Sequence, residues 1–141
     1  MDNRQPRPIS GVSMCVVRAG KALLARRTNP AGFGLWSFPG GHVHDGEPLR
    51  TAALRELKEE TGIEAEIVKL LDTIEITHRD STGDIEARFV LSVFAGTWLA
   101  GEAKAASDVS DVRWVGPDDL DGLKMTPGTG ELIRAALRQL T

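Results

Sequence analysis

The chain has 141 residues, 41% of them hydrophobic and 26% charged, which is the composition of one globular domain with its own core. Its formal net charge of −3 gives no general attraction for nucleic acid or a membrane surface, so a phosphate-rich ligand would need local arginines or metal ions. The single cysteine, Cys15, excludes an internal disulfide and a cysteine-based zinc site.

The predicted elements begin after a polar segment, residues 1–8, which is expected to be a flexible tail of a single domain spanning 1–141. The first ten residues lack the apolar core of a signal peptide, and no later run has the length of a membrane span. A cytoplasmic protein is therefore expected. Residues 9–17 and 21–27 predict two strands joined by a turn at Gly20.

The middle of the chain predicts a loop, a short strand and a helix. The Asn-Pro pair and the glycines of residues 28–34 indicate the loop, and residues 35–41 indicate a short strand that leads into two glycines. A helix is expected from about Glu47 to Thr61, with Gly62 in the left-handed conformation that ends many helices.

The second half of the chain predicts further strands and a closing helix. Residues 63–78 supply one or two strands, and a turn then leads to residues 85–98. Five apolar side chains of this last segment alternate and are expected on one face: Ile85, Ala87, Phe89, Leu91 and Val93. A short strand is expected over residues 111–115. The final segment has apolar residues at helical spacing: Leu132, Ile133, Ala136, Leu137 and Leu140. Several strands and two helices predict one α/β domain whose sheet is covered on both faces.

The central helix carries its carboxylates in an unusual place. On a helical wheel, one arc is expected to face the core: Leu49, Ala53, Leu54 and Leu57. Glu56, Glu59 and Glu60 border this arc instead of occupying the outer face. Like charges one turn apart repel, and partial burial raises the cost of ionising each carboxyl group.

Two explanations of these carboxylates are open. A solvated helix face, with the glutamates paired to Arg50 or Arg55, is the ordinary one, but lysines are missing at the i+4 positions. The other is a divalent cation such as Mg²⁺, which takes oxygen ligands and would relieve the repulsion directly. Gly40 and Gly41 precede the helix and let backbone groups approach a ligand closely. The combination favours a metal site.

The stretch "GGHVHDGEPLRTAALRELKEETGI", residues 40–63, resembles the Nudix box: Gly, five residues, Glu, seven residues, then Arg-Glu-apolar-any-Glu-Glu-any-Gly-apolar. The chain supplies every position of this pattern: Gly41, Glu47, Arg55, Glu56, Leu57, Glu59, Glu60, Gly62 and Ile63. The resemblance covers the whole chain and implies the family's α/β/α sandwich, with a mixed sheet between helices. It also implies hydrolysis of a nucleoside diphosphate linked to another group, X.

The resemblance implies Mg²⁺ or Mn²⁺ held by Glu56, Glu59 and Glu60, with the carbonyl group of Gly40 as a further ligand. The metal ion would neutralise the pyrophosphate, lower the pKa of a bound water and orient that water for attack on phosphorus. Arg55 is expected to orient the glutamates through charge-assisted hydrogen bonds.

Several roles remain open beyond the metal ligands. Glu47 is expected to tie the loop to the helix. The general base is either Glu60 or Asp108, which resembles a position where relatives often place a glutamate; the ordinary alternative for Asp108 and Asp111 is a solvated loop acid. Arg27, Gly41 and His42 are the candidate substrate contacts, with solvated strand-end charges as the alternative for Arg26 and Arg27. The three histidines, His42, His44 and His78, make no metal set. His42 and His44 alternate on a predicted strand and could approach phosphates, with placement on the surface as the alternative. Core positions are expected for Trp36, Phe38 and Trp114.

The box does not define the group X. No proline occurs between Gly62 and Gly116, where many ADP-ribose hydrolases of the family have one, and the chain lacks the tyrosine that relatives acting on dinucleoside polyphosphates often have. An upstream coenzyme A signature is also missing. We expect a small nucleotide substrate, either ADP-ribose or a nucleotide sugar. Oxidised or non-standard (d)NTPs are the alternative.

Two functions from other classes rank lower. Some proteins of this fold are regulatory modules that bind nucleotides without hydrolysis, but these tend to lose box glutamates, and this chain keeps all of them. An isoprenoid diphosphate isomerase shares the fold and needs a catalytic cysteine, for which Cys15 on the first strand is badly placed. No nucleic-acid or membrane partner is expected, and the resemblance allows a homodimer.

Overall fold

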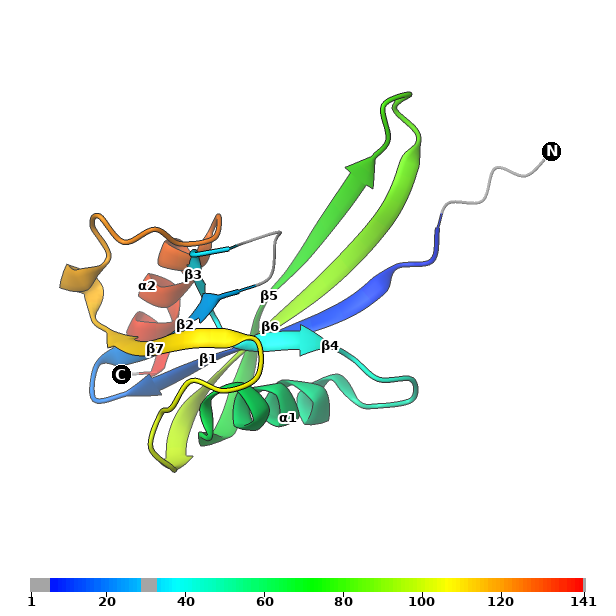
Figure 1. The fold of residues 1–141 in the computed structure, drawn as a ribbon. Helices are drawn as coiled ribbons and strands as arrows, with labels where there is room; N and C mark the ends of the chain where they lie inside the picture. Colours follow the sequence, from blue (N-terminus) through cyan, green and yellow to red (C-terminus); the bar gives the residue numbers. More distant parts are fainter. Residues whose placement is uncertain (1–5, 29–32, 141) are drawn as a thin grey trace.

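In the computed structural model, which describes residues 6–28 and 33–140, a mixed sheet lies between two helices (Figure 1). Its central strands follow the order β3-β2-β1-β6-β5, while β4 pairs with β1 and β7 pairs with β2. Strands β1 and β6 run parallel, and the other pairs are antiparallel. This arrangement confirms the predicted α/β/α sandwich.

Most strands agree with those expected from the sequence, but the single strand expected over residues 35–41 is two strands, which pair with different neighbours. Their bounds are β1 Ile9–Arg18, β2 Lys21–Arg27, β3 Trp36–Ser37, β4 Gly40–His42, β5 Glu64–Arg79, β6 Ile85–Ala100 and β7 Val109–Val115. The helices are α1 (Leu49–Thr61) and α2 (Thr129–Leu140), with a short 3₁₀ helix at Pro117–Asp119. Residues 1–5 of the predicted tail and residues 29–32 of the predicted loop lie outside the described residues. Neither described helix is long and apolar enough to cross a membrane.

Strand β1 forms the centre of the core, because it is buried on both faces. Val12, Met14 and Val16 pack in the apolar cluster that contains the inner face of α1. Cys15 and Val17 belong to the cluster on the opposite face, which contains the inner face of α2. Each helix thus covers one face of the same sheet.

Helix α1 begins two residues later than predicted, after Pro48, whose extended backbone precedes the first turn. It ends as predicted at Gly62, whose φ of 77° is left-handed and whose N–H donates to the carbonyl oxygen of Lys58. The prediction that Leu49 faces the core is wrong, since this side chain is 40% exposed. Leu49 comes directly after an exposed loop, and Ala52 is the residue of the first turn that is buried instead.

Strands β5 and β6 form one long hairpin that extends away from the rest of the fold (Figure 1). Register shifts between Ile67 and Lys69 and between Leu70 and Asp72 let residues 64–79 form a single strand with bulges. Of the five apolar residues predicted to alternate on β6, only Val93 is buried in the core. The outer part of this hairpin, residues 74–91, is called the arm below. Its apolar face is left partly uncovered beside the sheet.

Candidate active site

Strand β4 brings the backbone of Gly40 against the side chain of Glu60. The antiparallel pairing of β4 with β1 places Gly40 opposite Ser13, and the Gly40 N–H donates to Oε1 of Glu60 over 2.9 Å. A Cβ atom at Gly40 would lie 2.0 Å from the carbonyl oxygen of Val12, so only glycine fits. Glu60 is 8% exposed. The carboxylate is therefore held at the junction of α1 and the sheet.

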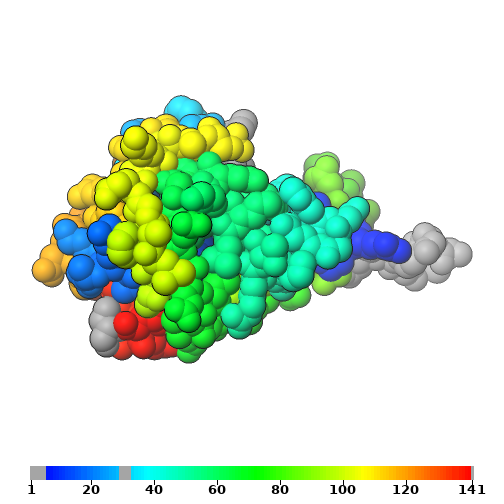
Figure 2. Space-filling view, turned by 90° about the horizontal axis from the view of Figure 1, so that it is seen from below, coloured from blue at the N-terminus to red at the C-terminus, as the bar shows by residue number. Residues whose placement is uncertain are grey.

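A loop also holds Glu60 from the other side. The N–H groups of Lys104 and Ala106 donate to the carbonyl oxygens of Thr61 and Glu60, over 2.9 and 3.0 Å. These bonds satisfy two of the carbonyl groups that a helix leaves unpaired at its end. Figure 2 shows this loop, in yellow, lying against the green end of α1.

The surroundings of Glu60 raise the pKa of its carboxyl group to about 7. Burial is the largest cause, because it penalises the charged form, and the charges of Glu56 and Asp108 act in the same direction. The hydrogen bond from Gly40 and the charge of Arg27 oppose the shift. A carboxyl group with this pKa can exchange a proton near neutral pH, as a general base must.

Arg55 connects the box residues to one another. Its Nε and one terminal nitrogen donate to the two carboxylate oxygens of Glu47, over 2.8 and 2.9 Å. The other terminal nitrogen donates to Glu56 over 3.0 Å and to Glu59 over 3.2 Å. The hydrogen bond with Arg55 is the largest cause that lowers the pKa of Glu47 to about 2. Arg55 also donates to the carbonyl oxygen of His42, over 3.0 Å. Arg55 thus contacts both the loop before α1 and the carboxylates of the helix, while the orienting role of Arg55 and the tie by Glu47 stay predictions.

The predicted metal ligands lie near one another only in part. In the part of the chain that the structure describes, no group of three or more His, Cys, Asp or Glu side chains is arranged to hold a metal ion. Glu59 is half exposed and bonded to Arg55, whereas Glu56 and Glu60 are close enough for the charge of one to raise the pKa of the other. Mg²⁺ commonly uses one or two carboxylates and completes its shell with water and substrate phosphates. The donor chemistry at Glu56, Glu60 and Gly40 fits such an ion.

A small pocket of about 50 Å³ brings Arg27 and Asp108 beside Glu60. Thr28, the residue after Arg27, holds Asp108 in place, because both its N–H and its hydroxyl group donate to the carbonyl oxygen of Asp108, over 3.3 and 2.5 Å. The neighbouring Arg26 lies opposite Asp111 on the β2–β7 ladder and does not line this pocket. The structure thus brings Arg27 and Asp108 to the site, as the sequence predicted.

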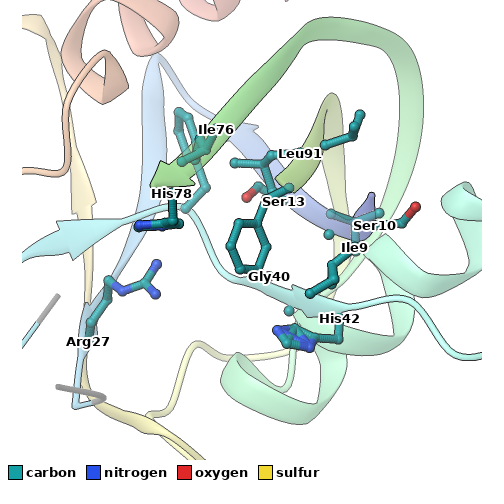
Figure 3. A pocket seen from close by; sticks show the side chains of 15 residues that line it. Ile9, Ser10, Ser13, Arg27, Gly40, His42, Ile76, His78 and Leu91 are labelled. Atoms are coloured by element: carbon teal, nitrogen blue, oxygen red, sulfur yellow. The ribbon is translucent and has the colours of Figure 1, made fainter. Parts of the chain in front are cut away.

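Two larger pockets adjoin the small one, since Arg27 and Phe38 line all three, and they are called the two lobes of a cleft below. The arm lobe, of about 390 Å³, includes Ile9, Ser10, His42, His78 and Phe89 in its lining. The helix lobe, of about 460 Å³, includes Ile74, Thr126, Pro127, Thr129 and Leu132. The two lobes share the residues Ser13, Arg27, Phe38, Ile76 and Leu91. Figure 3 shows the arm lobe, with Arg27 and His78 on one side and Ile9 and His42 on the other.

The cleft contains predicted residues and others that the sequence analysis did not assign to a site. Gly41 and the exposed His42 line the arm lobe, while His44 is exposed near Glu47 and lines neither lobe. Phe38 is buried, as predicted, yet it forms part of the wall of the small pocket and of both lobes. The arm residues were missed: Ile74, Ile76, His78, Phe89 and Leu91. Their alternation was the signal, but alternation does not tell whether a helix covers the apolar face.

Cys15 does not line the cleft or the small pocket. Its side chain is fully buried in the core, and burial raises the pKa of its thiol to about 12. A thiol in this state is inert at neutral pH. The isomerase alternative, which needs a catalytic cysteine, therefore has no support among the cleft residues.

Comparison with known proteins shows the family to which the chain belongs. A model of the NUDIX domain matches residues 7–136. The chain is a Nudix hydrolase. Among solved structures, a MutT NUDIX hydrolase from Burkholderia pseudomallei has a TM-score of 0.76 and 31% identity, with 96% of this chain and 100% of that chain covered. The NUDIX domain of Shewanella oneidensis NrtR, complexed with ADP ribose, also has a TM-score of 0.76, with 25% identity and coverage of 99% and 95%.

Relatives of this Nudix hydrolase carry different substrate names. An ADP-ribose pyrophosphatase from Methanocaldococcus jannaschii is 33% identical over 75% of this chain, which spans 63% of that protein. A CTP pyrophosphohydrolase from Escherichia coli is 33% identical, with 90% of both chains covered. An RNA pyrophosphohydrolase from Novosphingobium aromaticivorans is 33% identical, with 83% and 81% covered. The family and the pyrophosphatase class are thus established.

Proposed function

We propose that this Nudix hydrolase uses Mg²⁺ or Mn²⁺ to cleave a nucleoside diphosphate linked to a second group, with ADP-ribose or a nucleotide sugar as substrate. The observation that carries the proposal is the cleft with two lobes that meet at Arg27, beside Glu60. A substrate of this class has a group on each side of its pyrophosphate. Each lobe exceeds about 300 Å³, the lower end of ligand-pocket volumes.

The position of the phosphates follows from the charges. The guanidinium-bearing Arg27 lines the small pocket and both lobes, so a pyrophosphate at their junction would lie between Arg27 and the edge of α1. Glu56, Glu59, Glu60 and the carbonyl group of Gly40 would hold the metal ion. When bound, this ion supplies neutralisation of the phosphates and a water of lowered pKa.

The chain's own residues supply the proton acceptor. In hydrolysis, the water oxygen forms a bond to phosphorus, the bond from phosphorus to the bridging oxygen breaks, and the water loses a proton. Glu60 and Asp108, which both line the small pocket, are the two acceptors that the geometry offers. Arg55 keeps the neighbouring carboxylates oriented through its bonds to Glu47 and Glu56.

A nucleoside triphosphatase is the second candidate, and the E. coli CTP pyrophosphohydrolase supports it through its coverage of 90% of both chains. A triphosphate has a nucleoside at one end only, so it would leave one lobe without an organic group. A regulatory module that only binds nucleotides is the third candidate. All box glutamates are present in this chain, which favours hydrolysis. A homodimer, a cytoplasmic location and the lack of a nucleic-acid partner remain predictions.

The test is a hydrolysis panel with Mg²⁺ or Mn²⁺, read by mass spectrometry. It includes ADP-ribose, nucleotide sugars, normal and oxidised (d)NTPs, dinucleoside polyphosphates and an RNA with a 5′-triphosphate end. AMP plus ribose 5-phosphate from ADP-ribose is the expected product pair. A mononucleotide plus pyrophosphate from a triphosphate alone would favour the second candidate, and binding without cleavage would favour the third.

The matched variants of this test are Glu60→Gln and Glu66→Gln. Loss of a positioned acid–base group typically lowers turnover about 100- to 10,000-fold, so Glu60→Gln is expected to lose activity on this scale while its fold persists. Glu66 is exposed on β5 and lines none of the three pockets, so the same substitution there should leave turnover unchanged. Unchanged turnover in Glu60→Gln would refute the assigned site.

A further inference from the structure

We propose that the arm lobe binds the nucleobase of the substrate, with Phe89 and His78 as the residues that contact its planar ring. This inference rests on the proposed function, because it assigns one end of a nucleotide to one end of the cleft. The contacts come from the hairpin of β5 and β6, far along the chain from residues 40–63.

The pairing of β5 with β6 puts both rings on the same face of the arm. Ile76 lies directly opposite Phe89 and His78 directly opposite Ala87, so these four side chains share one face. The ring centroids of His78 and Phe89 are 5.4 Å apart, and the ring planes are at 88°. This perpendicular pair forms a corner in which a third planar ring can stack on one member and meet the edge of the other.

The two lobes differ in the rings that they offer. The arm lobe has three ring side chains that the helix lobe lacks among the described residues, namely His42, His78 and Phe89. Nucleobases stack on such rings whatever their sequence identity, because every base has a π face. The arm lobe is therefore the end that suits a base.

The helix lobe offers different chemistry. Apart from the shared residues, it is lined by aliphatic and hydroxyl-bearing side chains: Ser37, Ile74, Val93, Thr126, Pro127, Thr129 and Leu132. The hydroxyl groups of Thr126 and Thr129 lie 2.6 Å apart and each can donate or accept a hydrogen bond. Among the described residues, this lobe has no stacking ring besides the shared Phe38. The group X would then lie at this end of the cleft.

The lining of the arm lobe also reaches the glycines beside Glu56 and Glu60. Its lining runs from Phe89 and His78 to Arg27, Gly40 and Gly41, and the last two residues are in contact with Glu60 and Glu56. A base at the arm therefore directs its ribose and phosphates toward Arg27.

The experiment measures binding of AMP and of ribose 5-phosphate to the Mg²⁺-loaded protein by titration calorimetry. Phe89→Leu keeps an apolar side chain but removes the ring, and His78→Ala removes the second ring. The matched controls are Thr77→Ala and Arg88→Ala. Thr77 and Arg88 are neighbours of the two rings in sequence, lie opposite each other across the hairpin, and do not line either lobe.

The expected result is a selective loss of nucleotide binding. Removal of a stacking ring costs about 5- to 150-fold in affinity per base. Phe89→Leu should therefore weaken AMP binding on this scale, His78→Ala should weaken it less, and neither should change binding of ribose 5-phosphate. Phe89→Trp should retain the affinity for AMP. Equal AMP affinity in Phe89→Leu and Thr77→Ala would overturn the proposal, and so would an equal loss for ribose 5-phosphate.

The same variants separate this inference from the proposed function. If Phe89→Leu loses AMP binding but the wild type cleaves nothing in the panel, the base assignment stands and the hydrolytic proposal fails. If the wild type cleaves ADP-ribose and Phe89→Leu keeps the same KM and AMP affinity, the hydrolytic proposal stands and the base assignment fails.

Discussion

The backbone N–H of Gly40 donates a hydrogen bond of 2.9 Å to the carboxylate of Glu60, a residue 20 positions further along the chain. This bond joins strand β4 to helix α1 and points the carboxylate toward the pocket that also contains Arg27 and Asp108. It partly offsets the burial that raises the pKa of Glu60. The candidate catalytic group is thus positioned by a backbone donor of the sheet.

The two glycines of β4 should respond differently to alanine. A Cβ atom at Gly41 would lie 2.5 Å from the carboxyl carbon of Glu56, which is the flexible end of a side chain. Gly41→Ala should therefore displace this carboxylate and lower kcat/KM about 10- to 100-fold, with little change in Tm. At Gly40 the Cβ atom would meet the backbone of Val12 and Ser13, so Gly40→Ala should lose about 1–3 kcal/mol of stability. Thermal denaturation and steady-state kinetics check both, and equal stability of the two variants would contradict the contrast.

The titration of Glu60 predicts how the stability of the metal-free protein depends on pH. The pKa of Glu60 is raised from 4.5 to about 7 in the folded protein, so the folded state binds this proton more tightly than the unfolded chain. The free energy of unfolding should therefore fall as pH rises from about 4.5 to 7, by about 1–2 kcal/mol from this group. Urea denaturation in EDTA at pH 5 and pH 8 measures the change.

Glu60→Gln should remove this dependence, because glutamine does not titrate. In EDTA, the variant is expected to be more stable than the wild type at pH 8 and to approach it at pH 5. The exposed Glu66→Gln variant should keep the wild-type dependence. A Glu60→Gln variant that is less stable than the wild type at pH 8 would show that the ionised carboxylate stabilises the fold.

The contacts of the Arg55 guanidinium group predict that a lysine at this position cannot make the same set of hydrogen bonds. Arg55 binds both oxygens of Glu47 and also reaches Glu56, which a single ammonium group cannot do at once. Arg55→Lys should lower kcat/KM about 10- to 100-fold and weaken Mg²⁺ binding. Arg50→Lys is the control on the same helix, since Arg50 lies over the ring of Phe94 and outside the box contacts. Equal activity of the two variants would contradict the orienting role.

The pKa of Glu47 predicts a loss of the Arg55 contact in acid. Because this pKa is lowered from 4.5 to about 2, the folded state binds the proton of Glu47 less tightly than the unfolded chain. The stabilisation from the pair is present above about pH 4.5 and is lost as pH falls toward 2. NMR titration of the Glu47 carboxyl carbon measures the pKa directly, and Arg55→Lys should move it upward. A wild-type value near 4.5 would contradict the bidentate contact.

A substitution in the helix lobe should change binding of the group X and leave binding of the nucleotide unchanged. Leu132 lines this lobe, so Leu132→Phe should reduce its volume and raise KM for ADP-ribose about 10-fold without changing AMP affinity. Leu140→Phe makes the same change in the last turn of α2, where the side chain packs on the core and does not line the lobe. A parallel loss of AMP affinity in Leu132→Phe would place the base in the helix lobe instead.

The sequence by itself determined the chemistry of α1. Glu56, Glu59 and Glu60 share one edge because helical periodicity is a local property, and the spacing of the box was sufficient to predict the family and the sandwich fold. Strand β2 has the predicted bounds, and Gly62 ends α1 with the expected positive φ. These features depend on residues within a few turns of one another.

Only the tertiary structure decided how the cleft is formed. Alternation along β6 predicts that Phe89 and Leu91 share a face with Val93, but it cannot show that α2 covers Val93 and leaves Phe89 beside a cavity. The contact of Gly40 with Glu60 depends likewise on the pairing of β4 with β1, and the raised pKa depends on the burial that follows. A strand has the same side-chain period whether its apolar face is covered by a helix or left beside a cavity. Packing across the whole chain therefore decides which strands pair and what covers each face.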